Sequence, residues 1–295
     1  MDRSAHGLAC LLALAGLGAC RDNQAPEQTG GRIAEVAGTL EADSSGARAM
    51  RIMEQQPSSA VQSLARAAGG ADGLRYTVRR ASIDLAVNSG TIVGRISGGE
   101  RASRDSVVVP THDLGACAPF TQRLLPSTSD GVGNALVWLV GVASGSADTA
   151  SRRTPLRLAG CRLEPRVQRV PVGGTIMVTS RDVMMSRLRF SDAGAGSAVR
   201  STVMLNDAGQ VVPIAEASAQ PGLVMVHDDL HPWVRAWIAV SPHPYVAVTL
   251  ADGQFRFESV PSGRYTLVVW SEVLGTRTRE LQVTNGVETR LELKF

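Results

Sequence analysis

The amino-acid sequence predicts an all-β protein that follows an export signal. Short apolar runs recur from Thr91 onward at intervals of about ten residues, which is typical of strands in sandwiches and barrels. Glycine supplies 30 of the 295 residues, as many turns between short strands require. Asp252-Gly253 and Asn285-Gly286 each separate two alternating runs, and both dipeptides indicate β-hairpins.

Composition and charge exclude several classes of protein. Hydrophobic residues make up 44% of the chain and charged residues 19%, which excludes a disordered acidic chain, a collagen and a polytopic membrane protein. The net charge is only +3, and the arginines are scattered rather than clustered. We therefore expect no nucleic-acid partner.

Residues 1–19 form the expected signal peptide. Their apolar run, Gly7–Leu17, is too short to span a bilayer. Leu17-Gly18-Ala19-Cys20 resembles the bacterial lipobox, which implies cleavage before Cys20 and a diacylglycerol on its sulfur. Arg21 rather than Asp follows Cys20, so we expect an anchor in the outer membrane, facing the periplasm. An ordinary secretory signal with an incidental cysteine is the alternative.

Residues 20–88 are expected to form a tether with short helices. This stretch is rich in Ala, Gly and Gln and has few large apolar side chains. The candidate helices are Arg32–Leu40 and Ser58–Ala68; Gly69-Gly70 would end the second.

The cysteines predict one disulfide. Cys10 leaves with the signal and Cys20 would carry the lipid, so Cys117 and Cys161 remain as a pair in an oxidising compartment. Closing their loop would contribute about 4 kcal/mol in the chain-entropy model. A free catalytic thiol is the rival interpretation.

We expect a first sandwich in residues 89–243 and a smaller β module in residues 244–295. The strands expected in the first are Thr91–Ser97, Ser106–Val109, Ala135–Val140, Arg166–Val170, Thr175–Thr179, Thr202–Leu205, Gly209–Ile214 and Leu223–Val226. Those of the second are Tyr245–Thr249, Gln254–Phe257, Tyr265–Trp270, Arg277–Val283 and Glu288–Leu293. The module's inward-facing residues are expected to be Phe255, Phe257, Tyr265, Leu267, Val269 and Leu281.

The C-terminal module carries a family resemblance. The stretches Asp252–Phe255 and Val260–Leu267 resemble the carboxypeptidase-regulatory-like module. This resemblance implies a small transthyretin-like sandwich, classed with carbohydrate-binding-like folds, that performs no catalysis.

The preceding region resembles the cupredoxin-like domain of periplasmic proteins related to methylamine-utilisation proteins. The resemblance lies in Asp130–Leu139, Gly160–Val167, Val170–Thr175 and above all in Asp229–Trp237 and Ser241–Thr249. It implies a cupredoxin-like sandwich with a type-1 copper site, which needs two imidazoles, a thiolate and a weak axial Met.

The matched ligand positions are mostly replaced. After the turn residue Asp182, the first His position holds Ser186, the Cys position holds Asp228 and the Met position holds Val234. Only His231 is retained. The resemblance therefore implies a retained shape with the copper site lost, and we expect no cofactor. His231 is then expected to be structural, packed near Trp233 with one ring nitrogen bonded to backbone.

A rebuilt metal site is the alternative. His227, Asp228 and His231 lie close in sequence and His243 follows, and imidazole with carboxylate suits zinc or copper. In that case the protein would bind metal or transfer electrons through His227 and His231. Met184 and Met185 are expected to be core or loop residues rather than ligands.

No motif indicates an enzyme. The sequence has no Gly-x-Ser-x-Gly elbow, Walker loop or His-Glu-x-x-His pattern, and His112-Asp113 is typical of a turn. We therefore expect a membrane-anchored extracytoplasmic lipoprotein with a binding or scaffolding role. Its expected contacts are the membrane, through the lipid, and an unidentified protein or glycan.

Overall fold

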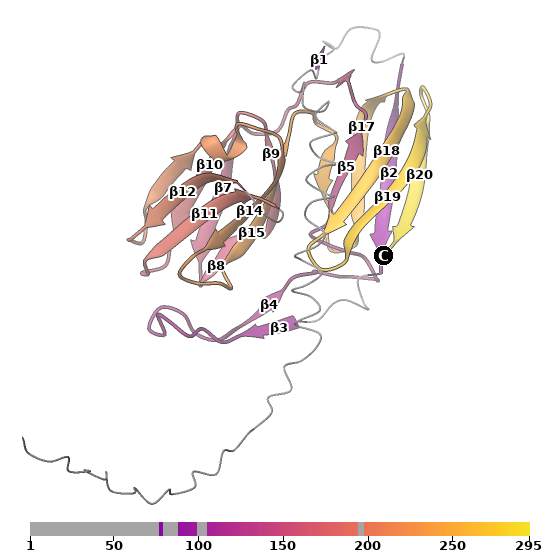
Figure 1. Cartoon of the computed structure of the whole chain (residues 1–295). Helices are drawn as coiled ribbons and strands as arrows, with labels where there is room; N and C mark the ends of the chain where they lie inside the picture. The colour runs from indigo at the N-terminus through magenta and orange to yellow at the C-terminus, as the bar shows by residue number, and fades with distance from the viewer. Residues whose placement is uncertain (1–76, 79–87, 99–104, 194–197) are drawn as a thin grey trace, which may run out of the picture. The chain divides into compact units, whose positions relative to one another are not determined.

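The structure, a computed structural model, describes residues 77–78, 88–98, 105–193 and 198–295. The expected signal peptide, Cys20 and both expected helices lie outside the described residues. Within them, strands β1–β20 dominate and the only helical turn is the 3-10 element η2, Glu216–Ser218 (Figure 1). No helix in this part of the chain is long and apolar enough to cross a membrane. The all-β prediction is confirmed.

The first sandwich consists of a four-stranded and a five-stranded sheet. The order of the first sheet is β13-β10-β7-β8 and that of the second is β12-β11-β14-β15-β9. The strands of the first sheet are β7 (Arg153–Ala159), β8 (Arg162–Glu164), β10 (Thr175–Ser180) and β13 (Val211–Ile214). Those of the second are β9 (Val167–Pro171), β11 (Ser186–Asp192), β12 (Val199–Leu205), β14 (Gly222–Asp228) and β15 (Arg235–Ser241).

Alternating burial along these strands makes the core of the first sandwich. In β10, every second residue from Ile176 is buried, as a strand with one face toward a core requires. Leu156 and Ile176 of one sheet belong to the same apolar cluster as Phe190 and Val226 of the other.

The second sandwich is assembled from segments far apart in the sequence. Its sheets have the orders β16-β5-β18-β19 and β17-β2-β20. The strands are β2 (Ser89–Ser97), β5 (Leu136–Val140), β16 (Val246–Val248), β17 (Gln254–Pro261), β18 (Gly263–Ser271), β19 (Gly275–Val283) and β20 (Glu288–Lys294). Figure 1 shows purple β2 and magenta β5 among the orange and yellow C-terminal strands. All six side chains expected to face inward belong to or pack on this core.

The strand pairing therefore does not follow the expected division into one sandwich of residues 89–243 and a module of residues 244–295. Strands β2 and β5 pair with C-terminal strands, and the nine strands β7–β15 are inserted between β5 and β16. Gly94 permits the pairing of β2 with β17, because a Cβ at this position would come within 2.3 Å of the Phe255 ring. A strand's apolar pattern shows that it is buried, but it does not identify its partner.

Both predicted hairpins are wrong. Asp252-Gly253 connects β16 to β17 and Asn285-Gly286 connects β19 to β20, and each pair of strands lies in different sheets. The two glycines have positive φ, at 80° and 68°, so the dipeptides do form tight turns. These turns form corners between layers, while the hairpin of the module is β18–β19, paired from Gly263 with Val283 to Ser271 with Gly275.

A third apolar cluster joins residues of both sandwiches. It contains Trp237 of β15 together with Trp138 of β5 and Trp270 of β18, and the rings of Trp237 and Trp270 meet edge to face at 4.9 Å. Beside it, Arg166 donates to both carboxylate oxygens of Glu272 at 2.9 and 2.5 Å. Both side chains are largely buried, so this ion pair fixes one sandwich to the other.

The remaining strands are short. β3 (Asp105–Val108) pairs with β4 (Phe120–Arg123), and β1 (Thr77–Val78) pairs with β6 (Ser144–Gly145). The segment between β3 and β4 carries Asp113 and Cys117 and reaches the first sandwich, where Cys117 forms a disulfide with Cys161. The predicted disulfide is confirmed.

Candidate functional site: the matched ligand positions

The four matched ligand positions meet at one end of the first sandwich. Ser186 begins β11, Asp228 ends β14, and His231 and Val234 lie in the loop before β15. All four side chains are buried, with exposed fractions of 0 or 1%. The Asp228 N–H donates to the Val234 carbonyl at 3.1 Å, and the Val234 N–H donates to the His231 carbonyl at 2.9 Å. Backbone hydrogen bonds therefore join three of the matched positions, Asp228, His231 and Val234.

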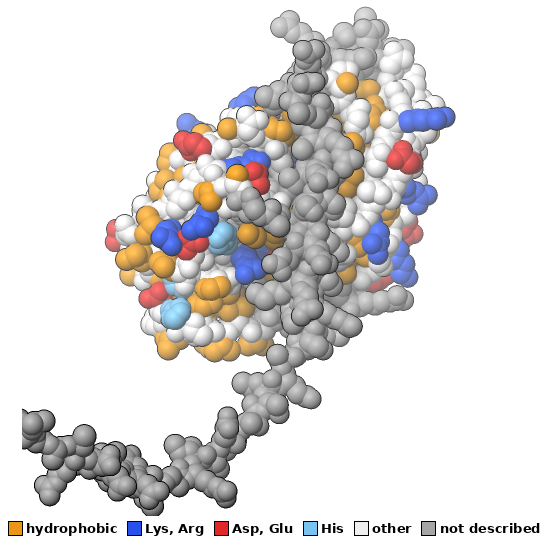
Figure 2. Space-filling view, in the orientation of Figure 1, with side chains coloured by type: hydrophobic (Ala, Val, Ile, Leu, Met, Phe, Trp, Pro, Cys, Tyr) orange, Lys and Arg blue, Asp and Glu red, His pale blue; other side chains and the backbone are white. Residues whose placement is uncertain are grey.

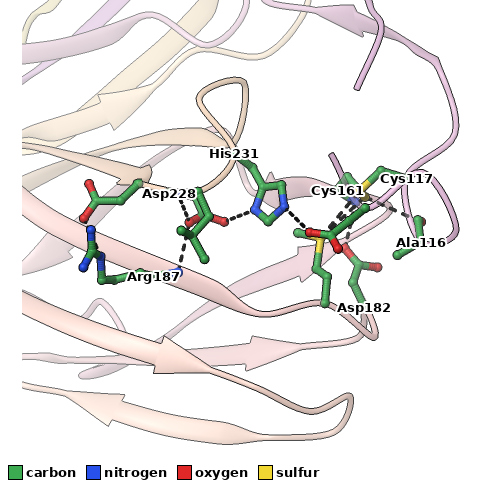
Figure 3. A network of polar contacts seen from close by, with 11 residues as sticks. Ala116, Cys117, Cys161, Asp182, Arg187, Asp228 and His231 are labelled. Carbon is green, nitrogen blue, oxygen red and sulfur yellow. Dashed lines mark hydrogen bonds and ion pairs between the residues drawn. A yellow bond between two sulfur atoms is a disulfide. The ribbon is translucent and has the colours of Figure 1, made fainter. Parts of the chain in front are cut away.

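The His231 ring lies between two carboxylates (Figure 3). Nδ1 is 2.6 Å from Asp228 Oδ2, and Nε2 is 2.8 Å from Asp113 Oδ2. The ring also packs edge to face on Trp233, with centroids 5.4 Å apart. The expected contact with Trp233 is confirmed. The expected bond to backbone is wrong, because both ring nitrogens bind side-chain carboxylates.

The second oxygen of Asp228 is also occupied. Oδ1 accepts hydrogen bonds from the backbone N–H of Arg187 at 2.9 Å and of Leu230 at 3.0 Å. Asp228 therefore ties the start of β11 to the loop that carries His231. A buried carboxylate needs such partners, because leaving it unpaired would be strongly destabilising.

The charge at this position favours a protonated imidazole. Burial opposes ionisation of His231, but hydrogen bonds to Asp228 and Asp113 and their negative charges outweigh it and raise the pKa of His231. An imidazole bonded to two carboxylates thus stands where the cupredoxin pattern has a metal and its thiolate.

Asp113 was not identified from the sequence as a site residue. Its segment is held down by the disulfide between Cys117 and Cys161, and the Asp113 carbonyl accepts from the N–H of Cys117 at 2.8 Å. The Asp182 carboxylate in turn accepts from the N–H of Cys161 at 2.7 Å (Figure 3). Asp113 lies 118 residues before His231, so only the disulfide prediction hinted at this contact.

Met184 packs on the disulfide. Its Sδ lies 3.4 Å from Cys117 Sγ and 3.8 Å from Cys161 Sγ, and its side chain belongs to the core cluster. Met185, by contrast, is 55% exposed. These positions match the expectation of core and loop residues.

The residues present do not fit a type-1 copper ion. Such a site needs a thiolate and a second imidazole beside His231, but Asp228 and Ser186 hold those positions, and Val234 offers no thioether. The Ser186 Oγ is buried without a hydrogen-bond partner among the described residues, and a hydroxyl does not replace an imidazole as a ligand.

The alternative metal site is not assembled either. His227 bonds to Asp229, with Nε2 3.2 Å from Oδ1, while His231 bonds to Asp228 and Asp113. His243 is buried beside Tyr245, with ring centroids 5.9 Å apart. In the ranges that the structure describes, no group of three or more His, Cys, Asp or Glu side chains is arranged to hold a metal ion.

Comparisons with known proteins add solved structures only. No family model and no curated protein matches the chain. A purple cupredoxin from Nitrosopumilus maritimus is 18% identical over 30% of this chain and 99% of its own, with a TM-score of 0.27. A variant of amicyanin with Cu(I) is 19% identical over 36% of this chain and 98% of its own, at a TM-score of 0.26.

A copper-containing nitrite reductase from Thermus scotoductus SA-01 is 20% identical over 35% of this chain and 25% of its own, at a TM-score of 0.25.

Proposed function

We propose that this protein is an extracytoplasmic lipoprotein with a binding or scaffolding role, whose former copper position has become a structural ion pair. The observation that carries the proposal is the position of the His231 ring between Asp228 and Asp113. Those contacts use both ring nitrogens, and with the hydrogen bond from the Arg187 N–H to Asp228 they join three segments of the chain.

The donor set argues against electron transfer through type-1 copper. A tuned one-electron couple needs copper bound to a thiolate, and no cysteine stands at this position. The chain's only described cysteines, Cys117 and Cys161, are already joined to each other.

The disulfide between Cys117 and Cys161 supports export. Disulfides persist in oxidising compartments, which agrees with a signal peptide and lipidation at Cys20. The lipid would hold the chain on the bacterial envelope, and the outer membrane facing the periplasm is the proposed location.

An open groove on the second sandwich supports a binding role. It crosses the outer face of the sheet β17-β2-β20, and its charged lining includes Arg95, Arg256, Arg290, Glu288 and Glu292. Several of these charges pair with one another, such as Arg290 with Glu288 at 2.7 Å. Alternating charges of this kind suit a polar protein or glycan partner.

Metal analysis of the purified full chain, with an absorption spectrum before and after Cu(II) addition, tests the proposal. We expect no stoichiometric metal and no intense thiolate-to-copper band. If a metal binds, His231→Gln tests whether His231 holds it, and the same change at the exposed His112 is the matched control. An intense visible band overturns the proposal, and so does stoichiometric copper or zinc that is lost in His231→Gln but kept in His112→Gln.

A further inference from the structure

A basic cluster occupies the outer face of the five-stranded sheet, away from the His231 site. Arg189 pairs across the ladder with His227, and His227 pairs with Arg235 on the next strand. Neighbouring strands lie about 4.8 Å apart, so these three residues form one row across β11, β14 and β15. Arg187 lies two residues before Arg189 on the same face, roughly 7 Å along the strand.

One carboxylate organises this cluster. Asp229 Oδ2 accepts from Arg187 Nε at 2.8 Å and from Arg189 Nη2 at 2.6 Å, while Oδ1 lies 3.2 Å from His227 Nε2. Figure 2 shows basic, acidic and His side chains next to one another on the visible face of the first sandwich. Asp229 thus fixes two guanidiniums and an imidazole on one patch of surface.

The cluster keeps a net positive charge. Burial, aided by the charges of Arg189 and Arg235, lowers the pKa of His227 despite Asp229, so the ring is neutral at neutral pH. Three arginines against one carboxylate leave a net charge of +2 (3 − 1). A chain with a net charge of only +3 therefore concentrates much of that excess here.

The guanidiniums of Arg187, Arg189 and Arg235 each keep N–H donors that bind no described residue. Arg187 uses Nε and Arg189 uses Nη2 on Asp229, and Arg235 uses Nε on the Pro232 carbonyl at 2.9 Å. Among the described residues, these three side chains have no other hydrogen-bond partner. Arg187 and Arg189 are 48% and 38% exposed, so their remaining N–H groups face solvent.

We propose that Arg187, Arg189 and Arg235 form a binding site for a phosphate monoester group. Guanidinium forks suit phosphate oxygens. A group with three free oxygens can accept hydrogen bonds from the arginines on both sides of His227. A phosphate monoester carries about −1.5 to −2 at neutral pH, which matches the charge of the cluster. A carboxylate offers only two oxygens and one charge. The monoester belongs either to a soluble phosphate compound or to a lipid headgroup.

Titration of the unlipidated full chain (Cys20→Ser) with inorganic phosphate tests this site. The imidazole signals are followed by NMR at constant ionic strength, and loss of one signal in His227→Gln assigns His227. We expect a saturable shift of His227. Arg235→Gln leaves the Asp229 contacts in place and weakens phosphate binding about tenfold. Asp229→Asn removes the competing negative charge and tightens it.

The control is Arg153→Gln, the same change at an exposed position of the opposite sheet. Vesicles of phosphatidylcholine with and without phosphatidic acid form the second arm. Binding to phosphatidic acid that is lost in Arg235→Gln identifies a headgroup, and a shift with inorganic phosphate alone identifies a soluble compound. Equal shifts with chloride, equal losses in Arg153→Gln and Arg235→Gln, or no response in either arm overturn the proposal.

Discussion

We expect the buried imidazole of His243 to make the protein less stable in mild acid. His243 comes two residues after the end of β15, and its side chain is 0% exposed and lies against Tyr245. Burial, together with the positive charge of Arg169, lowers the pKa of His243 from 6.5 to about 4. The unfolded chain therefore takes up a proton at a higher pH than the folded chain does.

This difference sets both the sign and the size of the effect. A gap of about 2.5 pH units (6.5 − 4), at about 1.36 kcal/mol per unit, corresponds to about 3 kcal/mol. Between pH 6.5 and about 4 the unfolded state binds more protons, so the free energy of unfolding falls as the pH falls. Above the unfolded pKa the group makes no such contribution.

Urea unfolding at a series of pH values measures the effect. The transition is followed by the fluorescence of the four tryptophans, and the free energy of unfolding is plotted for the wild type, His243→Gln and the exposed control His112→Gln. We expect His243→Gln to lower stability at neutral pH. We also expect the variant to lose about 3 kcal/mol less unfolding free energy than the wild type between pH 6.5 and about 4. A variant that keeps the full wild-type slope would falsify this reasoning.

Four further outcomes are expected. Cys117→Ala lowers the free energy of unfolding by about 4 kcal/mol in the chain-entropy model, and two free thiols titrated in the oxidised wild type would contradict the reasoning. His231 is expected to have the opposite pH dependence to His243, because its pKa is raised. Its stabilising contribution is full below pH 6.5 and is lost as the pH rises through the folded pKa. His231→Gln therefore removes this loss of stability with rising pH in urea unfolding. Asp228→Cys combined with Ser186→His restores measurable Cu(II) affinity with thiolate absorption, whereas Asp228→Asn with Ser186→His does not. Cys20→Ser abolishes labelling by radioactive palmitate and releases or stalls the protein, and an unlabelled wild type with unchanged membrane fractionation speaks against the anchor.

Local pattern was enough to predict many of the β runs and the pairing of Cys117 with Cys161. These features depend on alternation and on cysteine number. The positions Ser186, Asp228 and His231 came instead from the family resemblance, because no local pattern singles them out.

Partners across long separations were not predictable in the same way. Asp113 reaches His231 from 118 residues away, and β2 pairs with strands near the C-terminus. The turn at Asn285-Gly286 was predicted, but the sheet that each flanking strand joins was not. A dipeptide sets local φ and ψ, whereas sheet membership depends on which faces are left to be covered once the whole chain is present.

The split origin of the second sandwich has a consequence for the order of folding. β2 is the middle strand of β17-β2-β20, and Arg95 on it meets Glu292 across a separation of 197 residues. As the chain leaves the ribosome, β2 and β5 emerge well before the strands that they pair with and stay without those neighbours until the last strands arrive. The inserted strands β7–β15 can close their own core in the meantime. Contacts of such high sequence separation form slowly, so the early strands are the part of the nascent chain most in need of a chaperone.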